Sequence, residues 1–246
     1  MNVFDEREQR MKLKLKTKRL ILAIIGCLLI TSVFGFLIWT QFYYHADSSV
    51  ITLRKNDLTI ESKDNLTIVP EKDSTVGIIF YPGAKVESIS YLPVLKKIRD
   101  TANVTCILVK MPLNLAIFDG NAADEVIKKY PKIKTWYMAG HSLGGYIACE
   151  YAYNHQDTIQ GTILMGAYPY KDYPTSKLLT IYGTLNTSVA DKITYTENVV
   201  KIVGGNHAQF GNYGKQKGDP DATITADDQQ NITAKAVADF IAANTQ

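Results

Sequence analysis

Apolar residues form one uninterrupted segment near the start of the chain. Residues 20–39 carry no charge, and thirteen of these twenty residues are Leu, Ile, Val or Phe. A helix rises about 1.5 Å per residue, so a segment of this length spans the roughly 30 Å hydrocarbon core of a bilayer. Because the segment is apolar on every side, it is typical of a membrane-spanning helix. We therefore predict a transmembrane signal anchor over residues 20–40.

The flanks of this segment indicate its orientation. Residues 1–19 contain seven Lys or Arg and three Asp or Glu, whereas the aromatic residues Trp39, Tyr43 and Tyr44 lie at its other end. By the positive-inside rule, the basic tail of residues 1–19 stays in the cytoplasm. The sequence thus predicts a single-pass protein of the cell membrane, with the rest of the chain outside the cell.

Three other interpretations of the apolar segment stay open. A cleaved signal peptide needs small residues at the cleavage site, and residues 43–46 fit this requirement poorly. Residues 24–27 are similar to a lipidation site at Cys27, but apolar sequence continues for twelve residues beyond it. A buried core helix is disfavoured because the segment has no polar face.

Two patterns follow the anchor. Residues 41–75 are polar with short β-rich segments, which predicts a stalk and the first strands at 50–53, 58–61 and 66–69. Over residues 76–246, continuous apolar segments alternate with segments of helical spacing, which predicts an α/β domain with a parallel sheet covered on both faces. The predicted strands are 76–81, 104–109, 135–139, 159–165, 178–182 and 199–203, and the predicted helices are 89–102, 122–130, 143–153 and 225–243.

Charge and cysteine content exclude several classes of function. Beyond residue 19 the chain has 20 basic and 21 acidic side chains, and such a near-neutral domain does not favour nucleic-acid binding. Three cysteines are too few for a disulfide scaffold or a four-ligand zinc site. The sequence has no phosphate-binding loop and no dinucleotide motif, so we predict neither a metal nor a cofactor.

The segment Gly140-His141-Ser142-Leu143-Gly144 carries the clearest chemical signal. It matches G-x-S-x-G and lies between a predicted strand and a predicted helix, where a nucleophilic serine occupies a tight turn. Gly140 and Gly144 leave room for that turn. Ser142 is then the candidate nucleophile, and the Leu143 N–H at the helix start is a candidate oxyanion donor. In the alternative interpretation, Ser142 only caps the helix.

From about residue 76 to residue 240 the chain resembles the α/β-hydrolases, and among them the membrane-anchored or secreted α/β-hydrolases of Gram-positive bacteria. The resemblance is carried by FYPGAKV, PLNLAIF, AGHSLGG, LLTIYG and GGNHAQFGNYGKQKGD. It implies a mostly parallel sheet of about eight strands. It also implies a catalytic order of Ser, then Asp or Glu, then His along the chain.

The resemblance extends to a base and a second oxyanion donor. A serine hydroxyl needs a base within hydrogen-bond reach, and His207 follows a predicted strand where such a fold places its histidine. The second donor is expected after the first buried strand, where we assign the Ala84 N–H, with Lys85 as the nearest alternative. A structural loop role for His207 and an ordinary Pro-Gly turn before Ala84 stay open.

The acid of the triad is where the chain departs from the family. Relatives carry Gly-x-x-Asp after the corresponding strand, whereas this chain has Asn186 in the position of the acid. An amide oxygen can orient a histidine but cannot stabilise the imidazolium by charge. Three outcomes stay open: Asn186 orients the histidine weakly, Asp172 or Asp191 supplies the acid, or hydrolysis has been lost. Asp219 is expected to be a loop residue.

Further side chains are expected above the carboxyl end of the sheet. Lys215 and Lys217 could attract an anionic substrate, although a solvated loop face is the simpler interpretation. Six aromatic residues could line an apolar acyl or aryl pocket or only pack the loops. These are Tyr81, Tyr168, Tyr170, Tyr173, Phe210 and Tyr213.

Together these features predict a membrane-tethered extracellular serine hydrolase, of carboxylesterase type, that acts on a small ester or other acyl substrate. Ser142 would attack the acyl carbonyl, and His207 would carry the proton. The N–H groups of Leu143 and Ala84 would hold the oxyanion. The alternative, favoured by Asn186, is a hydrolase-fold binding or scaffold protein at the cell surface without turnover.

Overall fold

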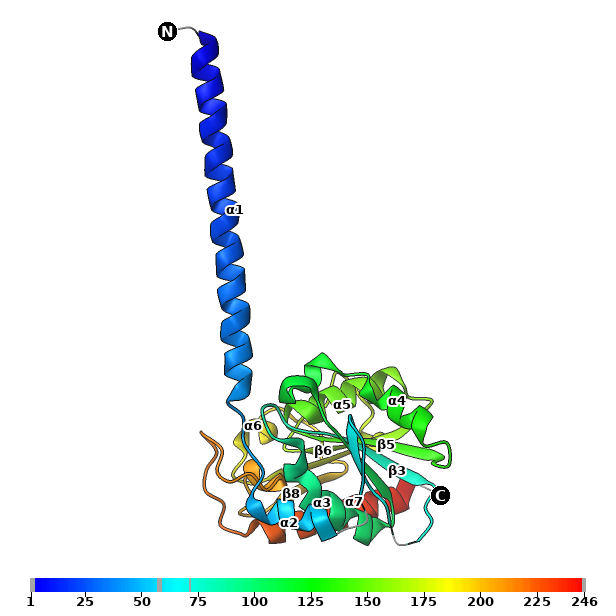
Figure 1. Cartoon of the computed structure of the whole chain (residues 1–246). Coiled ribbons are helices and arrows are strands. Elements are labelled where there is room, and N and C mark those ends of the chain that lie inside the picture. The colour runs from blue at the N-terminus through cyan, green and yellow to red at the C-terminus, as the bar shows by residue number, and fades with distance from the viewer. Residues whose placement is uncertain (1–2, 57–58, 71, 245–246) are drawn as a thin grey trace. The chain divides into compact units, whose positions relative to one another are not determined.

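The computed structural model describes residues 3–56, 59–70 and 72–244. The chain divides into two compact units, residues 1–42 and residues 43–246. The first unit contains helix α1 (Val3–Gln41). The second unit contains the sheet and the remaining elements (Figure 1).

Helix α1 is apolar over most of its length. It has 39 residues, and its segment Arg10–Gln41 is long and apolar enough to cross a membrane. Its large apolar side chains are exposed, among them Leu20, Leu29 and Ile38. A helix satisfies its own backbone hydrogen bonds, which a lipid environment requires. Its length and composition are those of a membrane span or of a signal sequence.

Within the described residues, eight strands form one sheet in the order β1-β2-β4-β3-β5-β6-β7-β8. β1 and β2 pair antiparallel, as do β2 and β4, and the other neighbouring strands pair parallel. The carboxyl ends of the parallel strands therefore meet at one edge of the sheet. The strands are β1 (Thr59–Glu61), β2 (Asn65–Ile68), β3 (Val76–Tyr81), β4 (Thr105–Val109), β5 (Thr135–His141), β6 (Ile159–Met165), β7 (Leu178–Gly183) and β8 (Val199–Ile202).

Helices cover both faces of this sheet (Figure 1). Helices α2, α3 and α7 contribute to the apolar core on one face, and α4 and α5 contribute to the core on the other. A short helix, α6, follows β7. The bounds are α2 (Ser48–Asn56), α3 (Leu92–Ala102), α4 (Ala122–Lys129), α5 (Leu143–Asn154), α6 (Thr187–Ala190) and α7 (Ala226–Asn244).

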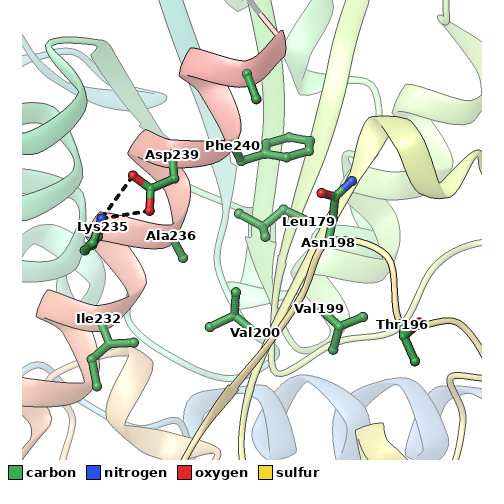
Figure 2. A pocket seen from close by; sticks show the side chains of 11 residues that line it. Leu179, Thr196, Asn198, Val199, Val200, Ile232, Lys235, Ala236, Asp239 and Phe240 are labelled. Atoms are coloured by element: carbon green, nitrogen blue, oxygen red, sulfur yellow. Dashed lines mark hydrogen bonds and ion pairs between the residues drawn. The ribbon is translucent and has the colours of Figure 1, made fainter.

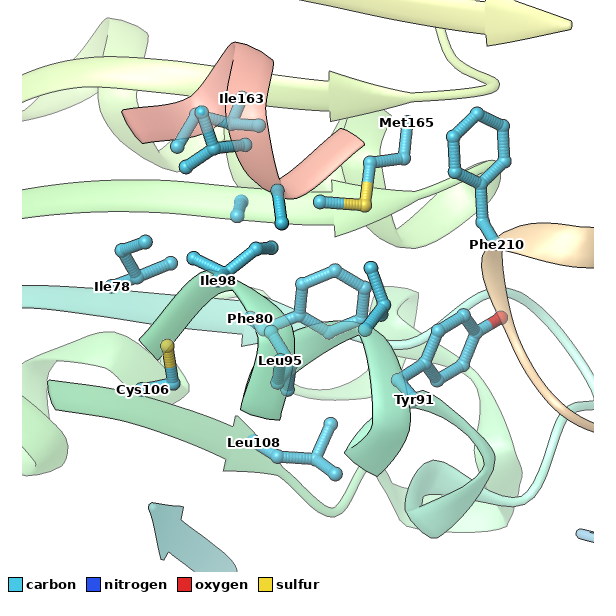
Figure 3. Close-up of a cluster of buried hydrophobic side chains, with 14 of the residues drawn as sticks. Ile78, Phe80, Tyr91, Leu95, Ile98, Cys106, Leu108, Ile163, Met165 and Phe210 are labelled. Carbon is cyan, nitrogen blue, oxygen red and sulfur yellow. The ribbon is translucent and has the colours of Figure 1, made fainter. Parts of the chain in front are cut away.

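Strand β3 shows why the central strands are continuously apolar. Ile78 and Phe80 belong to one buried cluster, and Ile79 and Tyr81 belong to the other. Successive side chains of a strand point to opposite faces, so a strand covered on both faces needs apolar residues at every position. Phe80 and Leu95 of α3 both belong to the first cluster, part of which Figure 3 shows.

The predicted α/β class is confirmed, and the predicted strands after residue 75 are present. The prediction of a β-rich segment at residues 50–53 is wrong, because these residues lie in α2. Val50 is buried and Leu53 packs against the same core, and this i, i+3 spacing suits a helix with one apolar face. Residues 59–61 and 65–68 form β1 and β2 and extend the main sheet. The predicted strand residue Leu58 lies outside the described residues.

Candidate active site

Ser142 joins β5 to α5 in a strained backbone conformation. Its φ is 52° and its ψ is −126°, a combination that costs a non-glycine residue about 1–3 kcal/mol. The Ser142 N–H donates to the Met165 carbonyl at 3.0 Å, and the Tyr146 N–H donates to the Ser142 carbonyl at 3.1 Å. These bonds hold the serine on the sharp strand-to-helix turn that its motif predicts.

Close backbone contacts require two glycines of the motif. A Cβ on Gly144 would collide with the carbonyl oxygens of Tyr81 and Pro82. A Cβ on Gly140 would lie 2.6 Å from the backbone of Gly144. The first turn of α5 therefore packs directly on the loop after β3, which is the loop that holds Ala84.

The N–H groups of this loop differ in whether they have an acceptor. The Gly83 N–H donates to the Tyr91 hydroxyl at 3.1 Å, and the Lys85 N–H donates to the Asn114 carbonyl at 2.8 Å. In the described chain, no hydrogen bond engages the Ala84 N–H between them. The Leu143 N–H is the first of α5, and the opening N–H groups of a helix have no carbonyl partner within it. Ala84, rather than Lys85, thus offers a free donor.

The structure brings Asn186 and His207 together. Asn186 follows β7, His207 follows β8, and the distance between Asn186 Nδ2 and His207 Nδ1 is 2.7 Å. Gly166, with a φ of +57°, leaves room for this pair, because a Cβ there would lie 3.0 Å from His207 Nδ1. Asn186 is only 6% exposed. A buried amide thus contacts the ring nitrogen that an acid would contact.

The amide presents its NH₂ group to the histidine. Asn186 Nδ2 donates to His207 Nδ1, and Ser188 Oγ donates to Asn186 Oδ1 at 2.6 Å. An imidazole whose Nδ1 accepts carries its proton on Nε2, where it cannot take a proton from a serine. A half-turn of the amide reverses both bonds, because Nδ1–H then donates to Oδ1 and Nδ2 donates to Ser188 Oγ. The Ser188 hydroxyl can satisfy the amide in either orientation.

The aspartates named from the sequence lie in different places. Asp172 and Asp191 are exposed, and within the described chain neither contacts His207. Asp219 is a loop residue, as expected, but its Oδ1 accepts the His207 N–H at 3.1 Å and its Oδ2 accepts the Ala208 N–H at 2.7 Å. Burial lowers the pKa of His207, and the charge of Asp219 opposes this shift. No sequence pattern indicated this contact, because it depends on how the loop after Phe210 folds back.

His141 is a site residue whose role the sequence did not indicate. Its Nε2 lies 3.0 Å from the His207 carbonyl, and its Nδ1 lies 2.8 Å from the Tyr91 hydroxyl. A carbonyl only accepts, so Nε2–H donates and Nδ1 accepts from Tyr91, whose oxygen accepts the Gly83 N–H. Burial, and then the nearby His207, hold the pKa of His141 well below its ordinary value. A neutral His141 thus links the histidine loop to the loop of Ala84.

Ser142 and His207 face a cavity of about 410 Å³. Lys217 lines this cavity, whereas Lys215 forms an ion pair with Asp221 at 2.6 Å. The lining is mostly polar, and it comes from the segment after β7 and the loop after Phe210. Its other members are Leu185, Asn186, Thr187, Ser188, Gln216, Gly218, Asp219 and Pro220.

Of the two alternatives for the six aromatic residues, the structure favours packing over lining this cavity, because none of them lines it. Four of the six aromatic side chains are buried in the two cores, namely Tyr81, Tyr173, Phe210 and Tyr213. Tyr168 and Tyr170 pack edge-on against Tyr146 instead, with ring centroids 5.8 and 5.5 Å away. The sequence could not show which way these side chains point, and Tyr81 belongs to strand β3 rather than to a loop.

A second hollow, of about 510 Å³, lies between edge strand β8 and helix α7 (Figure 2). Its apolar wall includes Val200, Ile232 and Phe240, and Lys235 and Asp239 form an ion pair at its margin with an N–O distance of 2.9 Å. It contains none of the candidate site residues. Among the described residues, no group of three or more His, Cys, Asp or Glu side chains is arranged to hold a metal ion.

Comparison with known proteins defines the class. Residues 77–231 match the model of the alpha/beta hydrolase family. The chain therefore belongs to the α/β-hydrolase family. No curated protein sequence matches it.

Solved structures share the fold at low sequence identity. Est1E from Butyrivibrio proteoclasticus, with ferulic acid bound, is 13% identical with a TM-score of 0.54, and the match covers 76% of this chain and 99% of Est1E. A monoacylglycerol lipase from Paleococcus ferrophilus is 11% identical with a TM-score of 0.50, covering 72% of this chain and 99% of the lipase. An arylesterase is 11% identical with a TM-score of 0.51, covering 77% and 85% of the two chains. These similarities establish the fold.

Buried His141 makes stability depend on pH. Its pKa is lowered in the folded state, whereas an unfolded histidine takes up a proton near pH 6.5. Below this pH the unfolded state thus binds more protons than the folded state. As the pH is lowered, the free energy of unfolding should therefore fall by up to about 1.4 kcal/mol per pH unit from this residue. Denaturant unfolding of the full chain in detergent between pH 5 and pH 8 measures the slope. His141→Gln should reduce it; an unchanged slope in His141→Gln would show that another group causes the pH dependence.

Proposed function

We propose that the chain is a serine hydrolase of carboxylesterase type that acts on a small ester. Membership of the α/β-hydrolase family supports hydrolase chemistry. The structures that share its fold include an arylesterase and a monoacylglycerol lipase, whose names support an ester as substrate. The polar cavity beside Ser142 favours a compact polar substrate over a long alkyl chain.

The observation that carries this proposal is the strained turn at Ser142. A serine with a φ of 52° persists only where surrounding contacts enforce it, and such strain is concentrated at functional sites. A helix cap needs no such conformation. The free N–H groups of Ala84 and Leu143 lie on the two segments that pack together at Gly144.

The reaction follows from these positions. Ser142 Oγ attacks the ester carbonyl carbon, its proton passes to His207 Nε2, and the carbonyl electron pair moves onto an oxygen held by the Ala84 and Leu143 N–H groups. The carbonyl then re-forms, the bond to the leaving alcohol breaks, and His207 returns the proton to that alcohol. Water repeats the sequence on the acyl-enzyme and releases the acid. Asn186 holds the His207 ring while this happens.

A second candidate function is a hydrolase-fold binding or scaffold protein without turnover. The observation that favours it is the hydrogen bond from the Asn186 NH₂ group to His207 Nδ1. In this arrangement the histidine carries its proton on the nitrogen that must accept one. Turnover requires the amide to adopt the opposite orientation.

Helix α1 holds this hydrolase at the cell membrane. Residues 1–19 form the cytoplasmic tail and residues 20–40 the span, because basic residues precede the apolar segment. Residues 41–75 and the domain of residues 76–246 lie outside the cell. The ester substrate is then one that is available at the outer surface.

Labelling with a fluorophosphonate tests the nucleophile. The parent should form a covalent adduct, because the probe requires an activated serine beside an oxyanion site. Ser142→Ala should abolish labelling, whereas Ser176→Ala, at an exposed serine, should not. Mass spectrometry of the peptide locates the adduct. A folded parent that stays unlabelled after long exposure would reject the hydrolase and support the scaffold.

The role of Asn186 is tested by introducing a carboxylate at its position and removing the carboxylates of the two alternative acids. Asn186→Asp should raise turnover of a short-chain ester by roughly 10²–10⁴, because a carboxylate stabilises the imidazolium and selects the reactive tautomer. Asp172→Asn and Asp191→Asn should change kcat little, because neither contacts His207. The outcome that contradicts this assignment is loss of turnover in either aspartate variant with no gain in Asn186→Asp.

The membrane topology is tested by protease accessibility. Protease added to intact cells should digest the domain beyond Tyr44, because the positive-inside rule places it outside. An epitope at the amino terminus should survive until the cells are lysed. Protection of the domain in intact cells would show that the orientation is reversed.

A further inference from the structure

The site needs a negative charge that Asn186 does not provide. The imidazolium formed during serine attack is stabilised in related enzymes by a carboxylate. At His207 the corresponding group is a neutral amide, whose partners are the histidine and the Ser188 hydroxyl. Resting on the proposed function, we propose that Asp219 is a positioning residue whose carboxylate stabilises protonated His207 through the backbone side, while Asn186 only orients the ring.

The contacts of Asp219 fix its charge beside the histidine. Its two oxygens accept the N–H groups of His207 and Ala208 at 3.1 and 2.7 Å. These two bonds hold the Asp219 carboxylate against the backbone of the histidine loop. A nearby negative charge favours a protonated imidazole, and the charge of Asp219 raises the pKa of His207 against the lowering effect of burial.

The loop that carries Asp219 is itself held in place. Asn206 Nδ2 donates to the Pro220 carbonyl at 2.9 Å, so the residue before His207 binds the residue after Asp219. The Asn206 backbone is held by Gln229 of α7, through bonds of 3.1 and 2.9 Å. Asn206 therefore anchors both the segment of His207 and the loop of Asp219, which fixes the two residues relative to each other.

The other titratable or charged groups around His207 do not supply this charge. His141 of β5 packs against the ring with centroids 4.4 Å apart, and its lowered pKa keeps it neutral. Lys217 lines the same cavity and would oppose protonation. Asp172 and Asp191 are exposed, and within the described residues no hydrogen bond or ion pair joins either of them to His207. Within the described chain, Asp219 remains as the source of negative charge.

The experiment measures the protonation of His207 directly, so that it does not depend on turnover. The full chain, with its four histidines isotopically labelled, is titrated by NMR in detergent micelles, and His207→Gln assigns the signal. Asp219→Asn should lower the His207 midpoint by about one pH unit, a tenfold loss of proton affinity. Asp221→Asn removes a carboxylate from the same loop that is paired with Lys215, and it should leave the midpoint unchanged. An unchanged midpoint in Asp219→Asn would overturn the proposal.

Two further variants separate charge from loop geometry. Asp219→Glu keeps the charge and should retain the parent midpoint; a midpoint lowered as far as in Asp219→Asn would mean that geometry is responsible and would overturn the proposal. Asn186→Asp in the Asp219→Asn background should restore the midpoint by placing a charge at Nδ1.

The kinetic measurement connects the charge to turnover. In Asp219→Asn the acid limb of the kcat/KM profile should move to lower pH and kcat should fall about tenfold, with recovery on adding Asn186→Asp. A fall in kcat with an unmoved acid limb would contradict the proposal. If the parent shows no hydrolysis, the proposed function fails. The NMR midpoints still decide whether the Asp219 carboxylate stabilises protonated His207.

Discussion

The packing of the first turn of α5 on the loop after β3 is the contact on which the site depends. Because Gly144 has no side chain, the backbone of α5 reaches the carbonyl oxygens of Tyr81 and Pro82. Ser142, with its positive φ, lies directly before this contact, and the free N–H groups of Ala84 and Leu143 lie on the two segments that it joins. The strained backbone of Ser142 costs about 1–3 kcal/mol, and the apolar packing of the two buried cores on either side of the sheet offsets this cost.

The loops of the site are held by side-chain acceptors and donors rather than by regular structure. His141 joins the oxyanion loop to the histidine loop through Tyr91 and the His207 carbonyl. Gln229 and Asp219 fix the backbone on the other side of His207. Buried backbone groups need partners, so each of these bonds also contributes to folding. A change at any of them therefore affects stability and the position of the histidine together.

The fold could be predicted from the sequence because its signals are local. Continuous apolar segments, such as residues 76–81, indicate strands covered on both faces, and the glycines around Ser142 indicate the turn. The pairing of Asn186 with His207 was also predictable, because both follow strands that end at the same edge of the sheet. The helix at residues 48–56 was missed because its few apolar residues fit both the period of a helix and the period of a strand. The contacts of His141 and Asp219 were missed because they depend on loop conformation, which no periodic pattern specifies.

The neutral amide of Asn186 favours the stability of the folded site, although a carboxylate at this position would favour catalysis. Asn186 is 6% exposed, and both ends of its side chain have hydrogen-bond partners. A carboxylate in that position would be a buried charge, which is costly unless it is paired. Its partner would be His207, whose pKa burial already lowers. The folded state therefore tolerates a neutral amide at this depth more easily than a carboxylate. Asp219 is only half-buried, so water and two backbone N–H groups share its charge, and the site can hold negative charge there at lower cost to folding.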